Sequence, residues 1–132
     1  MTEPTYYVSF WFREVLVPVD GSENSLKALD LAVDFARRYG SRITVLAATH
    51  GDASKLRAAV EARVAGRAPF EFKAVSLDEA TSPANEVLKE VGTGKYDAVI
   101  MGARGLTVSD INIGSTAMAV VANAPVTVII VR

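Results

Sequence analysis

The feature that most constrains the fold of this chain is a strict alternation of short strand-like runs with longer segments of helical periodicity. Five runs of four to six residues are rich in Val, Ile and Ala. The four segments between them repeat apolar residues at every third or fourth position. The expected strands are 15–19, 43–48, 70–75, 98–101 and 126–131. Strict alternation predicts a parallel sheet with helices on both faces and right-handed crossovers.

The ends of the predicted helices carry recognisable signals. Ser22 is a candidate N-cap for a helix from residue 23 to a glycine stop at Gly40, and Ser82 with Pro83 opens a helix that stops near Gly92. The other two helices are expected over 53–64 and 115–123. Pro18 fits its strand only near the end, because proline has no backbone N–H to donate.

Composition limits the chemistry that the chain can perform. Its 132 residues make one domain of 14.1 kDa, with no cysteine and one histidine. Disulfides, zinc ribbons, iron–sulfur clusters, thiol nucleophiles and His-rich metal sites are therefore excluded. A net charge of −1 and a pI near 5.8 argue against a nucleic-acid partner, which needs a clustered basic surface.

The sequence carries no recognisable targeting or membrane signal. The first twelve residues lack a basic segment, and no apolar run approaches the ~18 residues needed to cross a bilayer. We therefore expect a cytoplasmic protein with no membrane partner.

The N-terminus is unusually aromatic. Five of the ten aromatic residues precede the first strand, namely Tyr6, Tyr7, Phe10, Trp11 and Phe12. We divide the chain into an arm at 1–13 and a single α/β domain at 14–132. The arm is expected to pack on the domain or on a second copy; a nucleobase-stacking platform is the alternative, but these rings have only Arg13 as a basic neighbour in the sequence.

Two chemically distinctive segments follow the first and fourth strands. Asp20-Gly21-Ser22 comes directly after the first strand, and Gly102-Ala103-Arg104-Gly105 comes after the fourth. The last helix then opens with Gly114-Ser115-Thr116. If these two strands are neighbours at the centre of the sheet, the segments meet where ligands bind in open α/β sheets, beyond the carboxyl ends of the strands.

This combination of residues suits an anion. Glycines allow a ligand to approach the backbone, and the first amides of a helix point outward with the positive end of the dipole behind them. Arg104 adds a positive charge, and Asp20 can accept hydrogen bonds from an adenine amino group or a ribose hydroxyl. A nucleotide lying across the sheet is one interpretation. The other is that the glycines only turn the chain and Ser115 only caps its helix.

The segments PVDGS, MGARG and GSTAMAVVANAPVTVIIVR resemble the universal stress protein (UspA-like) family over residues 14–132. The resemblance implies a Rossmann-like three-layer α/β/α fold with five parallel strands in the order 3-2-1-4-5. It also implies ATP as ligand, with or without Mg²⁺, and a role in stress response or regulation. The residues carried over by motif are Pro18, Val19 and Asp20 near the adenine and ribose, Ala48 against the base, and Met101, Gly102, Arg104, Gly105, Gly114, Ser115 and Thr116 around the ribose and phosphates.

One departure from the family motif favours a different function. ATP-binding members carry G-x2-G-x9-G-[ST], whereas eight residues separate Gly105 from Gly114 here, and Asp110 lies among them. The alternative is a family member that binds no nucleotide and acts through dimer or partner contacts.

We expect no enzyme activity beyond slow ATP hydrolysis, and no catalytic or metal-binding residues. His50 follows the second strand, but a lone imidazole with no nucleophile or metal set nearby is typical of a loop residue. A small hydrolase or phosphotransferase using Asp20 or His50 is the remaining alternative.

The last strand predicts a homodimer. Residues 126–131 (VTVIIV) are apolar on both faces and contain no charge or internal proline, and in the order 3-2-1-4-5 they form an edge of the sheet. The family commonly pairs this strand across a dimer axis. The alternative is that the aromatic arm covers this edge within one chain.

Overall fold

The computed structural model describes residues 12–104 and 113–132. The elements are β1 (Glu14–Val19), α1 (Glu23–Tyr39), β2 (Arg42–Thr49), α2 (Ser54–Val64), β3 (Phe70–Ser76), α3 (Pro83–Val91), β4 (Ala98–Gly102), α4 (Ser115–Asn123) and β5 (Thr127–Val131). Each predicted strand and helix is confirmed, with ends that differ from the expected ones by about one residue. The last strand begins at Thr127 instead of Val126.

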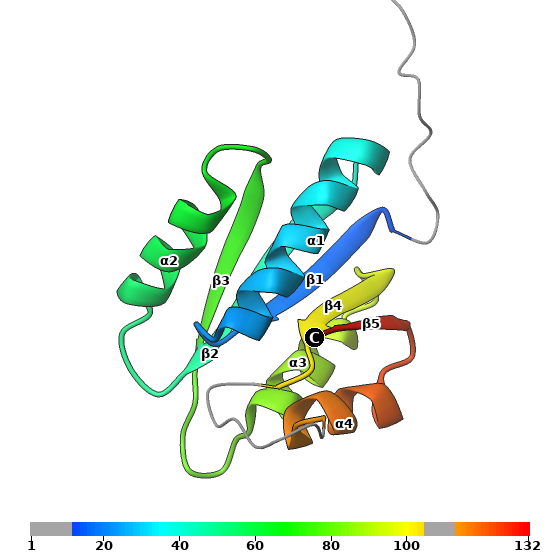
Figure 1. The fold of residues 1–132 in the computed structure, drawn as a ribbon. Helices are drawn as coiled ribbons and strands as arrows, with labels where there is room; N and C mark the ends of the chain where they lie inside the picture. The colour runs from blue at the N-terminus through cyan, green and yellow to red at the C-terminus, as the bar shows by residue number, and fades with distance from the viewer. Residues whose placement is uncertain (1–11, 105–112) are drawn as a thin grey trace, which may run out of the picture.

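All neighbouring strands are parallel, and they follow the order β3-β2-β1-β4-β5. Helices α1 and α2 cover one face of the sheet, and α3 and α4 cover the other (Figure 1). The predicted Rossmann-like three-layer α/β/α fold with strand order 3-2-1-4-5 is therefore confirmed.

The central strand β1 is buried on both faces. Val15, Val17 and Val19 pack under α1 and α2, while Leu16 packs against α3 and α4. Since successive side chains of a strand point to opposite faces, a strand covered on both sides needs apolar residues throughout. This explains why the sequence shows an unbroken apolar run here instead of an alternating one.

The predicted helix signals operate as expected. The Ser22 hydroxyl accepts a hydrogen bond of 3.2 Å from the Ser25 amide at the start of α1, and Gly40 ends this helix with φ of 74°. Ser82 accepts from the Asn85 amide and Pro83 is the first residue of α3. None of the helices in the described part of the chain is long and apolar enough to cross a membrane.

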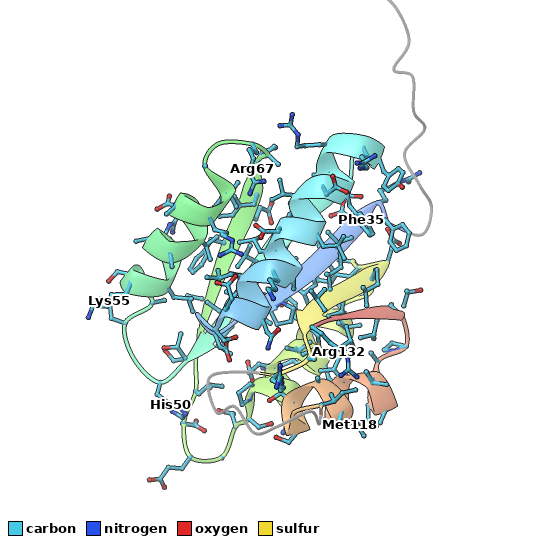
Figure 2. All side chains as sticks on the ribbon, viewed as in Figure 1. Phe35, His50, Lys55, Arg67, Met118 and Arg132 are labelled. Atoms are coloured by element: carbon cyan, nitrogen blue, oxygen red, sulfur yellow. The ribbon has the colours of Figure 1, made fainter. Side chains whose placement is uncertain are left out.

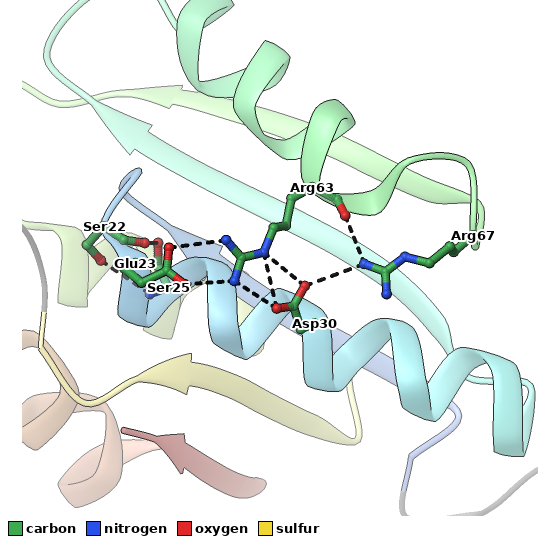
Figure 3. Close-up of polar contacts among 6 residues, drawn as sticks. All are labelled: Ser22, Glu23, Ser25, Asp30, Arg63 and Arg67. Atoms are coloured by element: carbon green, nitrogen blue, oxygen red, sulfur yellow. Dashed lines mark hydrogen bonds and ion pairs between the residues drawn. The ribbon is translucent and has the colours of Figure 1, made fainter.

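A charged cluster joins α1 to α2 on the outer surface. Arg63 of α2 lies 2.8 Å from a carboxylate oxygen of Asp30 and 2.8 Å from one of Glu23, both on α1 (Figure 3). Hydrogen bonds from Arg63 hold the pKa values of the Asp30 and Glu23 carboxyls below their usual range. The same two acids raise the pKa of the Arg63 guanidinium. The cluster fixes α2 against the helix whose first turn borders the site described below.

Residues 1–11 lie outside the described part of the chain, so the predicted roles of Tyr6, Tyr7, Phe10 and Trp11 stay predictions. Phe12 is the member of the aromatic group that the structure places. Its ring centroid lies 4.9 Å from that of Phe35 on α1, so this residue packs on the domain.

Candidate functional site

A cavity of about 200 Å³ lies at the carboxyl ends of β1 and β4, beside the first turn of α4. It brings together nine of the eleven residues predicted for the site: Pro18, Val19, Asp20, Ala48, Met101, Gly102, Arg104, Ser115 and Thr116. These come from four segments that are far apart in the sequence. Their roles in holding a ligand stay predictions, but their convergence is a property of the fold.

The two other predicted residues do not line this cavity. Gly105 lies within 105–112, outside the described residues, together with Asp110 and most of the eight-residue segment. Gly114 lies beside the cavity and packs on Ala103 and Arg104.

Sequence reasoning assigned no ligand contact to five residues that line the cavity, namely Ser25, Pro83, Val87, Ala103 and Ala117. Ala103 lies within the segment 102–105 that was expected to meet the ligand, and a signal existed for two of the others. Pro83 begins a helix that follows a parallel strand, which places it at the carboxyl edge of the sheet. Ser25 lies three residues beyond the N-cap Ser22, on the turn that follows β1. Nothing in the sequence indicated that Val87 or Ala117 faces this cavity.

The cavity opens where β1 and β4 cease to pair. Their register covers Val15 with Ala98 and Leu16 with Val99, whereas β1 pairs with β2 along its whole length. The Glu14 carbonyl accepts a hydrogen bond from the Asp97 amide, so the backbone groups of Glu14 face β4. Because alternate residues of a strand face the same neighbour, the backbone groups of Leu16 and Pro18 also face β4. Proline has no N–H to continue the ladder. The gap therefore begins at Pro18.

Asp20 is held at the mouth of the cavity by a compact turn. Its carboxylate accepts a hydrogen bond of 2.9 Å from the Ser22 amide, and its own amide donates to the Ser25 hydroxyl at 3.4 Å. The Ser25 hydroxyl in turn donates to the Ser22 carbonyl at 2.9 Å, and Gly21 adopts a φ of 89° that suits glycine. The first turn of α1 thus fixes both the backbone and the carboxylate of Asp20.

The end of β4 lies unusually close to α1. A Cβ atom at Gly102 would lie 2.7 Å from the Asn24 carbonyl carbon, closer than real Cβ atoms come to any atom. Only glycine fits at this position without displacing one of the two backbones. Beyond it, the Ala103 amide donates to the Val131 carbonyl at 2.8 Å, which extends β4 along β5.

The start of α4 at Ser115 agrees with the expected range, and its cap decides the alternative interpretation of Ser115. Gly114 is the N-cap and Ser115 is the first helical residue, so the interpretation of Ser115 as the cap is wrong. The Gly114 amide donates to the Ala103 carbonyl at 2.7 Å. Within residues 12–104 and 113–132, the amides of Ser115, Thr116 and Ala117 have no hydrogen-bond acceptor, as expected for the first turn of a helix.

The arrangement combines an apolar slot with a polar end. Pro18, Val19, Ala48 and Met101 supply apolar wall, while the first amides of α4 and the Arg104 side chain supply donors. A volume of about 200 Å³ is below the ~300–1,000 Å³ of typical small-molecule pockets. A cavity of this volume has room for only one part of a nucleotide-sized molecule.

Among the described residues, no histidine lines this cavity. His50 is exposed and does not line it. Among the residues that the structure describes, no three His, Cys, Asp or Glu side chains are placed to hold a metal ion together.

Comparison with known proteins gives one consistent result. Residues 12–132 match the family described as "Universal stress protein family". A Thermus aquaticus protein described as a universal stress protein in the QAH/OAS sulfhydrylase 3′ region is 29% identical, over 92% of this chain and 99% of the relative. A solved universal stress protein in complex with cAMP has a TM-score of 0.74 and 25% identity, covering 92% of this chain and 97% of its own. The Archaeoglobus fulgidus universal stress protein in complex with dAMP has a TM-score of 0.70 and 18% identity, covering 94% and 100%.

Proposed function

The chain belongs to the universal stress protein family, and on this premise we propose that it is a stress-response module that binds an adenine nucleotide, namely ATP. The nucleotide binds in the cavity between the carboxyl ends of β1 and β4. The observation that carries the proposal is the convergence of the Asp20 turn, the end of β4 and the first turn of α4 on one cavity.

The chemistry of the cavity supports this ligand. Pro18, Val19 and Ala48 offer an apolar wall to a flat base, and Asp20 offers an acceptor to a ribose hydroxyl. The amides of Ser115 and Thr116 offer donors to phosphate oxygens at the positive end of the α4 dipole. The relatives solved with cAMP and dAMP support an adenine nucleotide in general, and the triphosphate is our extension.

Mg²⁺ fits this proposal as an ion carried by the phosphates. The described residues offer no cluster of three protein ligands, and Mg²⁺ is commonly held by substrate phosphates and water with few carboxylates. When bound, it would neutralise phosphate charge. The protein would contribute hydrogen-bond donors to the phosphates, namely the first amides of α4 and the hydroxyls of Ser115 and Thr116.

Calorimetric titration of the full chain with Mg-ATP tests the proposal. We expect saturable heat with one ATP per chain, and mass spectrometry of the protein as purified should detect a carried-over adenine nucleotide. A folded protein that gives no heat with ATP, ADP or AMP would contradict nucleotide binding. Binding of AMP alone would retain the site and overturn the choice of ATP.

One observation favours the second candidate, a member of the family that binds no nucleotide and acts through dimer or partner contacts. The Gly114 amide is already bonded to the Ala103 carbonyl, so it is not available to a phosphate. The segment between Gly105 and Gly114 is also one residue shorter than in the ATP-binding motif. Absence of heat in the titration would support this candidate.

We propose that the protein binds ATP without hydrolysing it rapidly. We also propose that it acts in the cytoplasm. His50 lies outside the cavity, and Asp20 is engaged by the Ser22 amide. Steady phosphate release from ATP that disappears in Asp20→Asn or His50→Ala, while binding persists, would instead establish a hydrolase or phosphotransferase.

We further propose that two copies associate through β5. Within the described residues, this strand is an edge that pairs with β4 alone, and it is half-buried along its length. Met118 and Val121 of the adjacent α4 are exposed. Sedimentation velocity should give twice the 14.1 kDa of one chain. Val121→Lys should favour the monomer, whereas Ala58→Lys on α2 should not. A monomer at all concentrations would contradict the dimer.

A further inference from the structure

A second and larger cavity lies at the opposite end of the sheet, where the strands begin. Its volume is about 690 Å³, within the ~300–1,000 Å³ range of small-molecule pockets. The C-terminal end of α1, the starts of β2 and β3, and the connection from α2 to β3 surround it, and these lie at the same end of the molecule (Figure 1). It shares no lining residue with the cavity at the carboxyl ends of β1 and β4.

Positive charge is concentrated around this cavity. Arg37, Arg42, Arg67 and Lys95 line it, against two carboxylates, although the whole chain carries a net charge of −1. Figure 2 shows Arg67 at this end of the molecule, near the junction of α2 and β3. An excess of positive over negative charge on a concave surface raises the local concentration of anions.

The four cations are neutralised to different extents. Arg42 pairs with Glu14, and Lys95 lies 3.3 Å from Glu71. Arg67 donates to the carbonyls of Val64 and Arg63 and lies 3.5 Å from Asp30 (Figure 3).

Arg37 differs from the other three cations. It donates to the Arg67 carbonyl at 3.2 Å, and no carboxylate pairs with it among the described residues. Its guanidinium therefore retains most of its donors for a ligand, and its planar fork matches a phosphate or carboxylate.

Ser41, whose buried hydroxyl has no partner among the described residues, lines the same cavity. Ser41 is 6% exposed, and its Oγ is the buried side-chain atom that lacks a hydrogen bond within residues 12–104 and 113–132. An unsatisfied buried polar atom destabilises the fold, so such atoms call for an explanation. Ser41 follows Gly40 directly and lies four residues beyond Arg37, and all three line the cavity.

The remaining wall is largely apolar. Ile43, Ala68 and Phe70 line the cavity beside the charged residues, and Phe70 is half-buried. A bare inorganic ion would leave this surface uncovered. An anion attached to an apolar body would contact both kinds of wall.

We propose that this cavity binds a small organic anion, whose phosphate or carboxylate group contacts Arg37 and Ser41 and whose apolar body lies against Phe70. The site is independent of the nucleotide-binding cavity at the other end of the sheet. Its ligand satisfies the Ser41 hydroxyl and pairs with the guanidinium of Arg37.

Amide NMR of the full chain tests this site directly. Phenyl phosphate and phenylacetate serve as probes for the two oxyanions, and benzyl alcohol serves as the neutral control of similar shape. We expect at least one of the anions to produce saturable shifts at Gly40, Ser41 and Phe70, with no such shifts for benzyl alcohol. Whichever anion binds more tightly identifies the phosphate or carboxylate source. Shifts confined to Ser115 and its neighbours, or equal shifts with benzyl alcohol, would overturn the proposal.

Two adjacent arginines provide a matched pair of variants. Arg37→Gln should weaken binding of the preferred probe at least about tenfold, a loss typical of a charged hydrogen bond. Arg38→Gln should change it less than twofold, because Arg38 pairs with Asp34 and does not line the cavity. Equal affinities of the two variants would overturn the assignment of Arg37.

Ser41→Ala provides a readout that a purely structural serine would not give. Without probe, this variant should be as stable to heat as the unmodified chain or more stable, because the unsatisfied hydroxyl is removed. It should nevertheless bind the anion severalfold more weakly. Loss of stability together with unchanged affinity would contradict a ligand-binding role for the hydroxyl.

Discussion

Replacing Gly102 with alanine is expected to lower the free energy of unfolding by about 1–3 kcal/mol, the usual cost of adding atoms to a well-packed site. The added Cβ would lie 2.7 Å from the Asn24 carbonyl carbon and 2.9 Å from the Asn24 oxygen. Both atoms belong to the backbone of α1, so no flexible side chain can move aside to make room for the Cβ. The end of β4 and the first turn of α1 must separate.

Urea unfolding followed by circular dichroism measures this loss, and Gly51→Ala is the matched control. A Cβ at Gly51 meets no atom within 4 Å, and its φ is not in the left-handed region, so this substitution should change the unfolding free energy by less than ~0.5 kcal/mol. The separation in Gly102→Ala should also alter the adjacent cavity and weaken ATP binding. Equal stability of the two variants would show that α1 is not held against β4 as described.

The double variant Ser115→Ala/Thr116→Ala is expected to bind ATP about a hundredfold more weakly than the unmodified chain. Each hydroxyl lines the cavity, and a hydrogen bond to a charged group contributes ~1.5–3 kcal/mol, or about tenfold to a hundredfold in affinity. The helix should persist, because Gly114 is its N-cap and no side chain caps it. Alanine also favours helix more than serine or threonine does.

Calorimetry with Mg-ATP measures the affinity, and thermal unfolding verifies that the fold is retained. Ser54→Ala is the matched control, since Ser54 is likewise the first residue of a helix but does not line the cavity. It should leave the affinity unchanged. An undiminished affinity in the double variant would show that the phosphates bind elsewhere than at the start of α4.

The order and type of the elements could be predicted because each carries a local signal. The unbroken apolar run of β1 indicates a strand covered on both faces, and Ser22 and Gly40 mark the two ends of α1 by their capping chemistry. The strand order itself came from resemblance to a family. Local signals specify elements, whereas the neighbours of a strand depend on packing between distant segments.

The candidate site could be predicted only where its residues follow a strand directly. Asp20 and Arg104 stand at the carboxyl ends of β1 and β4, which the parallel topology brings to one edge. Ala117 and Val87 lie on helices that reach the cavity through their packing against the sheet, and no local pattern gives that angle. The approach of Gly102 to Asn24 has the same origin.

The cap of α4 shows a further limit of sequence reasoning. Gly114 and Ser115 are both acceptable N-caps by residue type, so the sequence left open whether Ser115 caps the helix or begins it. The Met118 amide donates to the Gly114 carbonyl at 3.0 Å, which makes Gly114 the N-cap, and the Gly114 amide is itself held by the Ala103 carbonyl across a long connection.

The cavity at the starts of the strands had no sequence signal at all. Arg37, Arg67 and Lys95 are separated by about thirty residues each: Arg37 lies in the last turn of α1, whereas Arg67 follows α2 and Lys95 follows α3. They share a location because α1, α2 and α3 all end at the same edge of a parallel sheet.

The gap beside Pro18 has a consequence for how this architecture can diversify. The opening between β1 and β4 begins where the Pro18 nitrogen has no hydrogen to donate. It is therefore a property of the main chain and does not depend on the size of a neighbouring side chain. Substitutions of the residues at the mouth of the cavity can therefore change which ligand binds, while the opening between the strands persists. In such a scaffold, the tertiary amide nitrogen of the proline sets where a ligand can enter, and the surrounding side chains determine which ligand that is.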